Sequence, residues 1–204
     1  MNNTNKTVNT FAGVEEIPAR VFSYLLTNNS EECENFWKVL YYPTADALQK
    51  DKLTLKQKRD LIWRGQPNES DYKLFNKPVI SDSMVTGDNM IQMRMFRYGD
   101  NPVKPIKANL LFEFELYTND KLSNIINEND MFVERTDYLE NRLKDILNGT
   151  DIGLGYGYLA YNRELSTYSK STMSINNSKS YYGRTFMMVL EYMNVSKDIG
   201  CEEF

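Results

Sequence analysis

The sequence has no histidine among its 204 residues. Serine and cysteine nucleophiles that rely on a histidine base, and metal sites built on imidazole, are therefore excluded within one chain. Carboxylates, lysines and tyrosines remain for chemistry. The acidic residues that stand out are scattered: Asp82, Asp88, Glu128, Asp130, Glu134 and Asp137. We predict no catalytic residue and no enzymatic activity.

Two short motifs resemble ligand-binding loops without meeting their requirements. The glycines of Gly153–Gly157 follow a predicted helix and open a predicted strand, whereas a phosphate-binding loop follows a strand and opens a helix. The segment Glu128–Asp130 lacks the 12-residue pattern of an EF-hand. We predict a turn and a solvated loop, with a weak metal site as the alternative for the second, and expect no cofactor and no metal.

Two groups of aromatic residues are candidates for recognition. Trp37, Tyr41 and Tyr42, together with Trp63, would suit a stacking platform for bases. Their helical spacing, without a surrounding basic patch, favours the core or a subunit interface. Tyr181-Tyr182-Gly183-Arg184 indicates either a strand with an exposed arginine or an intersubunit contact. The interface candidates are Trp37, Tyr41, Tyr42, Tyr181, Tyr182 and Arg184.

The composition favours a globular protein that does not bind nucleic acid tightly. Hydrophobic residues make up 41% and charged residues 25%, and the net charge is −4. Sequence-independent binding to nucleic acid rests on an excess of Lys and Arg. Cys33 and Cys201 lack metal-site spacing and are expected to be free thiols. The polar N-terminus and the lack of a long apolar run predict a cytoplasmic protein without membrane contact.

The first third of the chain has the signals of three helices. Apolar residues recur at helical spacing in 19–27. Ser30 is a typical N-cap for a second helix that ends at Pro43. Thr54 and Gln57 form a capping box for a third helix, expected to run to about residue 64, with Gly65 ending it. Residues 66–88 are polar and predict a long excursion.

The remainder predicts strand, strand, helix, strand, strand. The predicted strands are 90–98, 108–117, 156–168 and 181–193, and the predicted helix is 134–148. The fold class is therefore α+β: a four-stranded, mainly antiparallel sheet with a packed helix (ββαββ) and an N-terminal helical subdomain. The predicted divisions are a flexible arm (1–13), a helical region with a loop (14–88), the α+β core (89–197) and a tail (198–204).

In order and pattern, residues 17–195 resemble structural neck proteins of tailed bacteriophages, of the head–tail connector and tail-terminator class. The segments that carry the resemblance are LLTNNSEECENFWKVLYYPTADAL, LTLKQKRDLIWRG, FEFELYT, RTDYLENRLKDILNG and YYGRTFMMVLEYMN. The resemblance implies a homo-oligomeric ring in the virion, assembled in the host cytoplasm. Its partners would be the portal, other neck or tail proteins and the passing genomic DNA. The rival interpretations are an enzyme using carboxylates or lysine, and a nucleic-acid-binding regulator.

Two expectations about assembly follow from this resemblance. The acidic balance suggests a channel wall that repels phosphate, to which Glu113 and Glu115 would contribute if their face of the strand points inward. Pairing of these acids across the sheet with Arg94 or Arg97 is the alternative. The polar segments 1–13, 66–88 and 169–180 are candidates for ordering only in the assembly.

Overall fold

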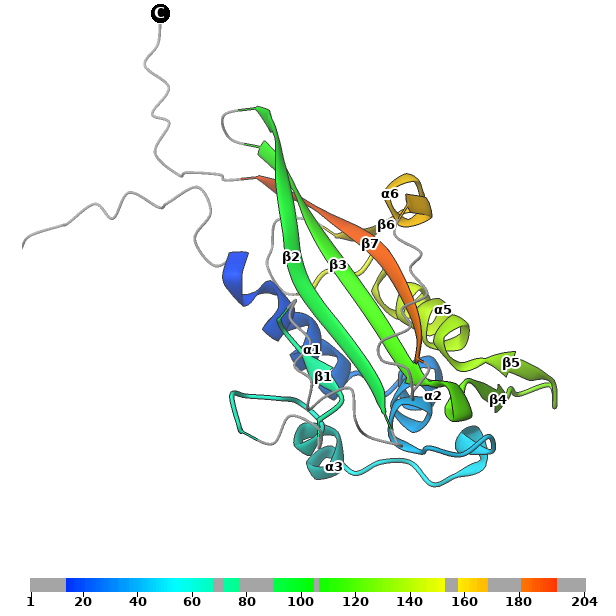
Figure 1. The fold of residues 1–204 in the computed structure, drawn as a ribbon. Helices are drawn as coiled ribbons and strands as arrows, with labels where there is room; N and C mark the ends of the chain where they lie inside the picture. Colours follow the sequence, from blue (N-terminus) through cyan, green and yellow to red (C-terminus); the bar gives the residue numbers. More distant parts are fainter. Residues whose placement is uncertain are drawn as a thin grey trace, which may run out of the picture.

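The computed structural model describes residues 14–67, 72–77, 90–104, 107–152, 158–168 and 181–193 (Figure 1). The helices are α1 (Ile17–Thr27), α2 (Glu31–Tyr41), α3 (Leu55–Asp60), α5 (Arg135–Leu147) and α6 (Arg163–Tyr168), with 3-10 turns η1 (Val14–Glu16), η2 (Ala47–Gln49) and η4 (Asp120–Leu122). The strands are β1 (Leu74–Phe75), β2 (Ile91–Lys104), β3 (Lys107–Asn119), β4 (Asn124–Ile126), β5 (Phe132–Glu134), β6 (Leu159–Asn162) and β7 (Tyr181–Met193).

The main sheet has five strands in the order β1-β2-β3-β7-β6. Strand β1 is parallel to β2, and the other neighbours are antiparallel. The mixed α+β class and the mainly antiparallel sheet are confirmed, but the prediction of four strands is wrong. A separate two-stranded sheet, β4–β5, projects from the body (Figure 1).

The additional strand β1 lies inside the segment expected to be a polar excursion. Leu74 and Phe75 are both fully buried. The backbone amide of Trp63 donates to Leu74 O at 2.9 Å, and that of Met93 donates to Lys73 O at 2.7 Å. A two-residue strand held by distant partners has too little sequence for an alternating pattern, which is why the sequence did not reveal it.

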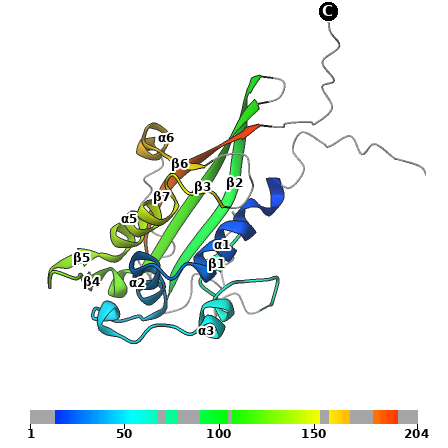
Figure 2. The ribbon, with the colours of Figure 1, turned by 180° about the vertical axis from the view of Figure 1, so that it is seen from behind.

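The two faces of the sheet carry different side chains. Leu110, Phe112, Phe114 and Leu116 of β3 lie on one face and are fully buried, as the alternation predicts. The register places Phe186 beside Phe114, and the two rings stack with centroids 4.8 Å apart. Helices α1, α2 and α5 cover this face (Figures 1 and 2). Strand β7 lies between β3 and β6, so it is a central strand of the sheet.

The helix caps follow the sequence closely. The Ser30 hydroxyl accepts a hydrogen bond from the Cys33 amide at 3.3 Å, and Thr54 and Gln57 form the predicted capping box. Helix α3 nevertheless ends at Asp60 rather than near residue 64, because Ile62 instead forms a β-bridge with Leu74. Gly65 follows with a φ of 89°, which a glycine adopts without strain.

The later elements confirm one prediction and correct another. Helix α5 matches the predicted helix, and its residues Leu139, Leu143 and Leu147 are fully buried. The predicted strand 156–168 is wrong in its second half, since β6 ends at Asn162 and α6 follows at once. Asn162 ends the strand by capping: its side-chain oxygen accepts from the Leu165 amide at 3.0 Å.

Several predicted segments lie outside the described residues. They are the arm 1–13, the glycines 153–157, the hairpin tip 169–180, the tail 198–204 and most of the excursion 66–88. Within the described part of the chain, no helix is both long and apolar enough to cross a bilayer.

Candidate subunit interface

Trp37, the first aromatic interface candidate, belongs to the core. Its side chain is fully buried, and its indole nitrogen donates to the Leu25 carbonyl at 2.9 Å. The Cys33 thiol donates to the same carbonyl at 3.2 Å. A side chain enclosed in this way is not available to a second subunit, so Trp37 is corrected from interface candidate to core residue that joins α2 to α1.

Tyr41 and Tyr42 lie at the end of α2, half-buried against the core. Their rings meet edge to face with centroids 4.9 Å apart, and the Tyr42 hydroxyl donates to the Asp51 carbonyl at 3.2 Å. Both rings therefore have partners within the chain while part of their surface remains exposed. The backbones of Tyr181 and Tyr182 pair with Asn119 and Thr118 of β3; their side chains are outside the described part.

Arg184 was predicted as an exposed arginine or as an intersubunit contact, and its side chain has partners within the chain. Its guanidinium forms ion pairs with three acids of the α5 region: Asp137, Glu134 at 3.5 Å and Glu140 at 3.6 Å. Burial raises the pKa of Asp137, and the Arg184 charge opposes that rise. Arg184 thus fastens β7 to α5, and its remaining exposure is what a neighbour would meet.

Arg135 is a buried cation that binds backbone. Its side chain is fully buried at the start of α5. The guanidinium donates to four carbonyls at 2.7–3.0 Å: Val39, Tyr42, Thr44 and Leu122. Burial lowers its pKa to about 10. Because these carbonyls belong to the end of α2, the chain after it and η4, Arg135 fixes three segments beside the hairpin β4–β5.

A second buried charge pair joins α3 to α2. Lys58 Nζ lies 2.6 Å from Glu34 Oε1, and both side chains are almost fully buried. The Lys58 ammonium also lies 5.9 Å from the centroid of the Trp37 ring. Such a pair orients the two helices more than it stabilises them, and it sets where α3 and the residues after it stand.

The lumen candidates Glu113 and Glu115 lie on the sheet face opposite the helices. Arg94, in register with Glu115, forms an ion pair with it at 3.4 Å, which confirms the predicted cross-strand pairing. Arg97 is in register with Phe112, so it lies on the same face as Phe112 and not on the face of these acids. Burial raises the pKa of Glu113, and the Glu115 charge raises it further. Burial also raises the pKa of the Glu115 carboxyl, and the positive charge of Arg94 opposes this rise.

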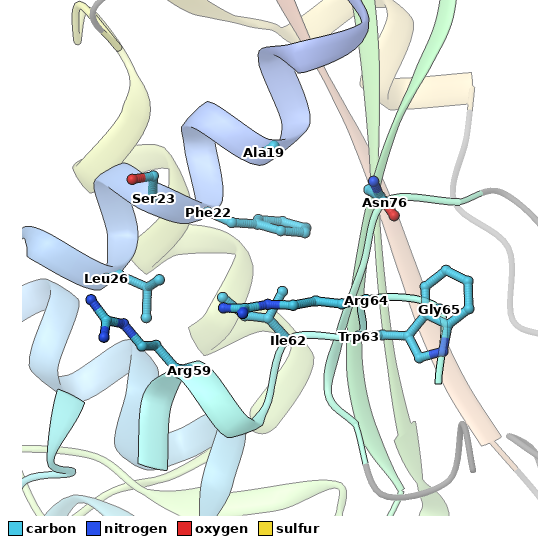
Figure 3. A pocket seen from close by; sticks show the side chains of 10 residues that line it. All are labelled: Ala19, Phe22, Ser23, Leu26, Arg59, Ile62, Trp63, Arg64, Gly65 and Asn76. Atoms are coloured by element: carbon cyan, nitrogen blue, oxygen red, sulfur yellow. The ribbon is translucent and has the colours of Figure 1, made fainter. Parts of the chain in front are cut away.

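A groove of about 810 Å³ lies between α1 and the chain that follows α3 (Figure 3). Phe22 and Leu26 line it from α1, and Ile62 lines it from the opposite side. The guanidinium groups of Arg59 and Arg64 point into this space toward α1 (Figure 3). A second hollow beside it shares Arg59, Ile62 and Arg64.

The groove carries an excess of positive charge. Lys56, which lines the second hollow, pairs with Asp60 at 3.0 Å. Arg59 and Arg64 have no carboxylate within ion-pair distance among the described residues. No basic patch was expected near the aromatic residues, but Arg59 and Arg64, from the continuous segment that also carries Trp63, line the same groove. Net charge alone conceals such local grouping.

The hairpin β4–β5 carries Phe132, the most exposed large apolar side chain in the described part of the chain, and Met131 beside it. Phe132 is 74% exposed and Met131 54%. The Asn127 side-chain oxygen accepts from the amides of Asn129 at 2.9 Å and Met131 at 3.0 Å, so the turn is rigid. Asp130 completes it with a φ of 56°, a conformation that Asp tolerates better than most residues.

The hairpin is also tied to the body. Glu128 accepts hydrogen bonds from the Tyr138 hydroxyl of α5 and from the side-chain amide of Asn35 of α2, the latter at 3.2 Å. The Ile126 amide donates to Ala45 O at 2.8 Å. The sequence predicted Glu128–Asp130 as a solvated loop, and all three residues are exposed in a turn; Glu128 in addition anchors this turn to α5 and α2. The turn-forming residues 127–130 beside two apolar residues were the available signal for a presented hairpin.

Among the described residues, no group of three or more Cys, Asp or Glu side chains is placed to hold a metal ion. The ionised groups that do cluster, around Arg184, Arg135 and Lys58, bind other parts of the same chain. In the described part of the chain, two surfaces combine exposed apolar or charged groups in a way that suits a partner: the groove with Arg59 and Arg64, and the hairpin tip with Met131 and Phe132. Neither was among the predicted interface residues.

Comparison with known proteins defines the class to which the chain belongs. Residues 34–190 match the YomW family, a span that runs from the first turn of α2 to near the end of β7. The chain is a member of the YomW family. The family name is of a type given to phage-derived Bacillus proteins, which suggests a phage-associated protein. Searches among curated proteins and among solved structures gave no significant match.

Proposed function

We propose that the protein is a structural subunit of a phage virion that forms a ring in the neck, between portal and tail. The observation that carries this proposal is the rigid hairpin tip with Met131 and Phe132 exposed. Large apolar side chains presented on a fixed turn are typical of protein–protein contacts. Membership of the YomW family supports a phage context, and the resemblance of residues 17–195 to neck proteins supports the position in the virion.

The distribution of charge suits a subunit beside DNA that must keep moving. Glu113 and Glu115 lie on the sheet face opposite α1, α2 and α5. Glu115 is paired with Arg94, so the half-buried Glu113 is the acid that would meet the DNA. At physiological salt the Debye length is about 8 Å, so only acids close to the DNA would repel it. In the proposed ring this face lines the channel. A channel lined mainly by Lys and Arg would contradict this part of the proposal.

The experiment is a mass measurement of the purified chain alone and after mixing with neck and portal fractions of the virion. A ring subunit forms closed oligomers, or forms them when its partners are added. Immunogold labelling of virions should then place the chain at the junction of head and tail. A monomer that never joins virion fractions would overturn the proposal.

One rival function has a specific observation in its favour. Lys56, Arg59 and Arg64 share one surface, and a nucleic-acid-binding regulator would use such a patch on phosphate. DNA binding by the monomer, falling steeply with salt and lost in Arg59→Glu/Arg64→Glu, would favour that rival. The ring subunit is expected to show only weak binding that no single patch dominates.

A further inference from the structure

The hairpin tip and the groove lie on opposite sides of the molecule. In both ribbon views, β4 and β5 project from one side, and helices α1 and α3, which border the groove, lie on the other (Figures 1 and 2). A contact between two such surfaces on two copies is head to tail, and repetition of a head-to-tail contact produces a ring or a filament.

The chemistry of the two surfaces is complementary. The tip offers Phe132 and Met131, with Asp130 beside them. The groove offers the apolar side chains of Leu26 and Ile62, with the cations Arg59 and Arg64 pointing into the same space (Figure 3). Asp130, Arg59 and Arg64 have no ion-pair partner among the described residues of their own chain. Each surface therefore supplies both an apolar group and the charge that the other lacks.

The tip is also preorganised for insertion. The two hydrogen bonds to Asn127 fix the turn, and the contacts of Glu128 with Tyr138 and Asn35 hold the hairpin against the body. A segment that is already rigid loses little conformational entropy on binding. One aromatic anchor seated in a pocket dominates many protein interfaces, and Phe132 has the exposure that such an anchor needs.

The geometry points to a self-association in which the hairpin tip 127–132 of one copy inserts into the groove of the next, with Phe132 against the apolar wall and Asp130 facing Arg59 and Arg64. The occupant is a second copy of this chain. This inference adds the contact that would build the proposed ring, and so it rests on the self-association in that proposal.

Two full-length variants test the contact from each side. The tip variant is Met131→Ser/Phe132→Ser, with Tyr158→Ser, also an exposed aromatic, as its control. The groove variant is Arg59→Glu/Arg64→Glu, with Lys52→Glu/Lys121→Glu, which changes the net charge equally, as its control. The four charged positions that are replaced are exposed on the surface. Thermal unfolding should therefore show that each variant stays folded. Sedimentation velocity then measures self-association.

We expect each test variant to weaken self-association by at least about tenfold, while both controls behave like the wild type. The decisive measurement is the equimolar mixture of the two variants. The tip variant keeps an intact groove and the groove variant keeps an intact tip, so one contact per pair remains. The mixture should form dimers that grow no further. A mixture that stays monomeric, or a tip variant that assembles normally, overturns the inference.

A photocrosslinking residue in place of Phe132 gives an independent readout. Crosslinks should join it to 19–26 or 59–65 of a second, isotopically labelled chain; no crosslink, or crosslinks elsewhere, would overturn the inference. If Glu202→Gln/Glu203→Gln abolishes assembly while the tip variant does not, the acidic segment 198–204 occupies the groove instead. Rings built through other surfaces would leave the proposed function standing. If the tip pairs with the groove but the chain is absent from virions, only the proposed role in the phage neck is overturned.

Discussion

The guanidinium of Arg135 donates a hydrogen bond of 2.7 Å to the backbone carbonyl of Val39. The two residues are 96 positions apart, and the bond joins the first turn of α5 to the last turn of α2. The carbonyls of Tyr42 and Thr44 accept from the same group. The last carbonyls of a helix have no partner inside it, so here a buried arginine provides the missing donors.

Replacing Arg135 with Met should therefore be strongly destabilising. Four carbonyls would lose their donor inside the protein, at an expected cost of about 3–5 kcal/mol. Arg135→Lys should also destabilise, because one ammonium cannot reach carbonyls of three segments. Urea unfolding measures both. If Arg135→Met unfolds at the wild-type urea midpoint, the guanidinium does not hold these three segments together.

Leu143 tests whether α5 supports the sheet. It is fully buried, and Leu143→Ala should reduce the free energy of unfolding by about 2–5 kcal/mol through lost transfer energy and a residual cavity. The matched control is Asn141→Ala on the exposed side of the same helix, for which we expect little change. Equal effects of the two substitutions would show that the stripe of α5 does not face the core.

Cys33 should be chemically inert in the native protein. It is fully buried, and burial raises the pKa of its thiol to about 12. The thiolate is the reactive form, and little of it exists near pH 8. In a Cys201→Ser background, a thiol reagent should react only when denaturant unfolds the chain. Rapid reaction in native buffer would mean that the α1–α2 contact opens readily.

Glu113 should cost stability at neutral pH. Its pKa is raised in the folded state, so the native chain binds the proton more tightly than the unfolded chain. That stabilisation is complete below the unfolded pKa and is lost as the pH rises through the folded pKa. Glu113→Gln should thus raise the midpoint of thermal unfolding slightly near pH 7, with the gain shrinking in acid. Asp51→Asn, which neutralises an exposed carboxylate, is the matched control.

The sequence predicted the parts of the fold in which local chemistry and burial agree. Alternation in β3, the stripe of α5 and the capping residues Ser30 and Thr54 all specify their elements directly. Two features escaped because their cause is distant in sequence. Strand β1 depends on Leu61 and Met93 for its backbone partners, and α3 stops early because Ile62 bridges to Leu74.

The candidate interface was less accessible to sequence analysis than the fold. Trp37 and Arg184 looked available to a partner, but the first is enclosed by α1 and the second is paired with α5. Conversely, sequence analysis assigned Phe132 no role, and the turn at Asn127 places it outside the core. Exposure is a property of the assembled fold, and no spacing within the chain reports it.

The central position of β7 has a consequence for synthesis of the protein. The ribosome completes β3 more than 60 residues before β7. During that interval one edge of β3 is an unpaired row of amides and carbonyls beside the apolar residues Phe112 and Phe114, and it can pair with another nascent chain. We therefore expect the nascent chain to need chaperones, and to aggregate, mainly during this interval. Ribosome stalling just before residue 181 should cause more aggregation than stalling after residue 193.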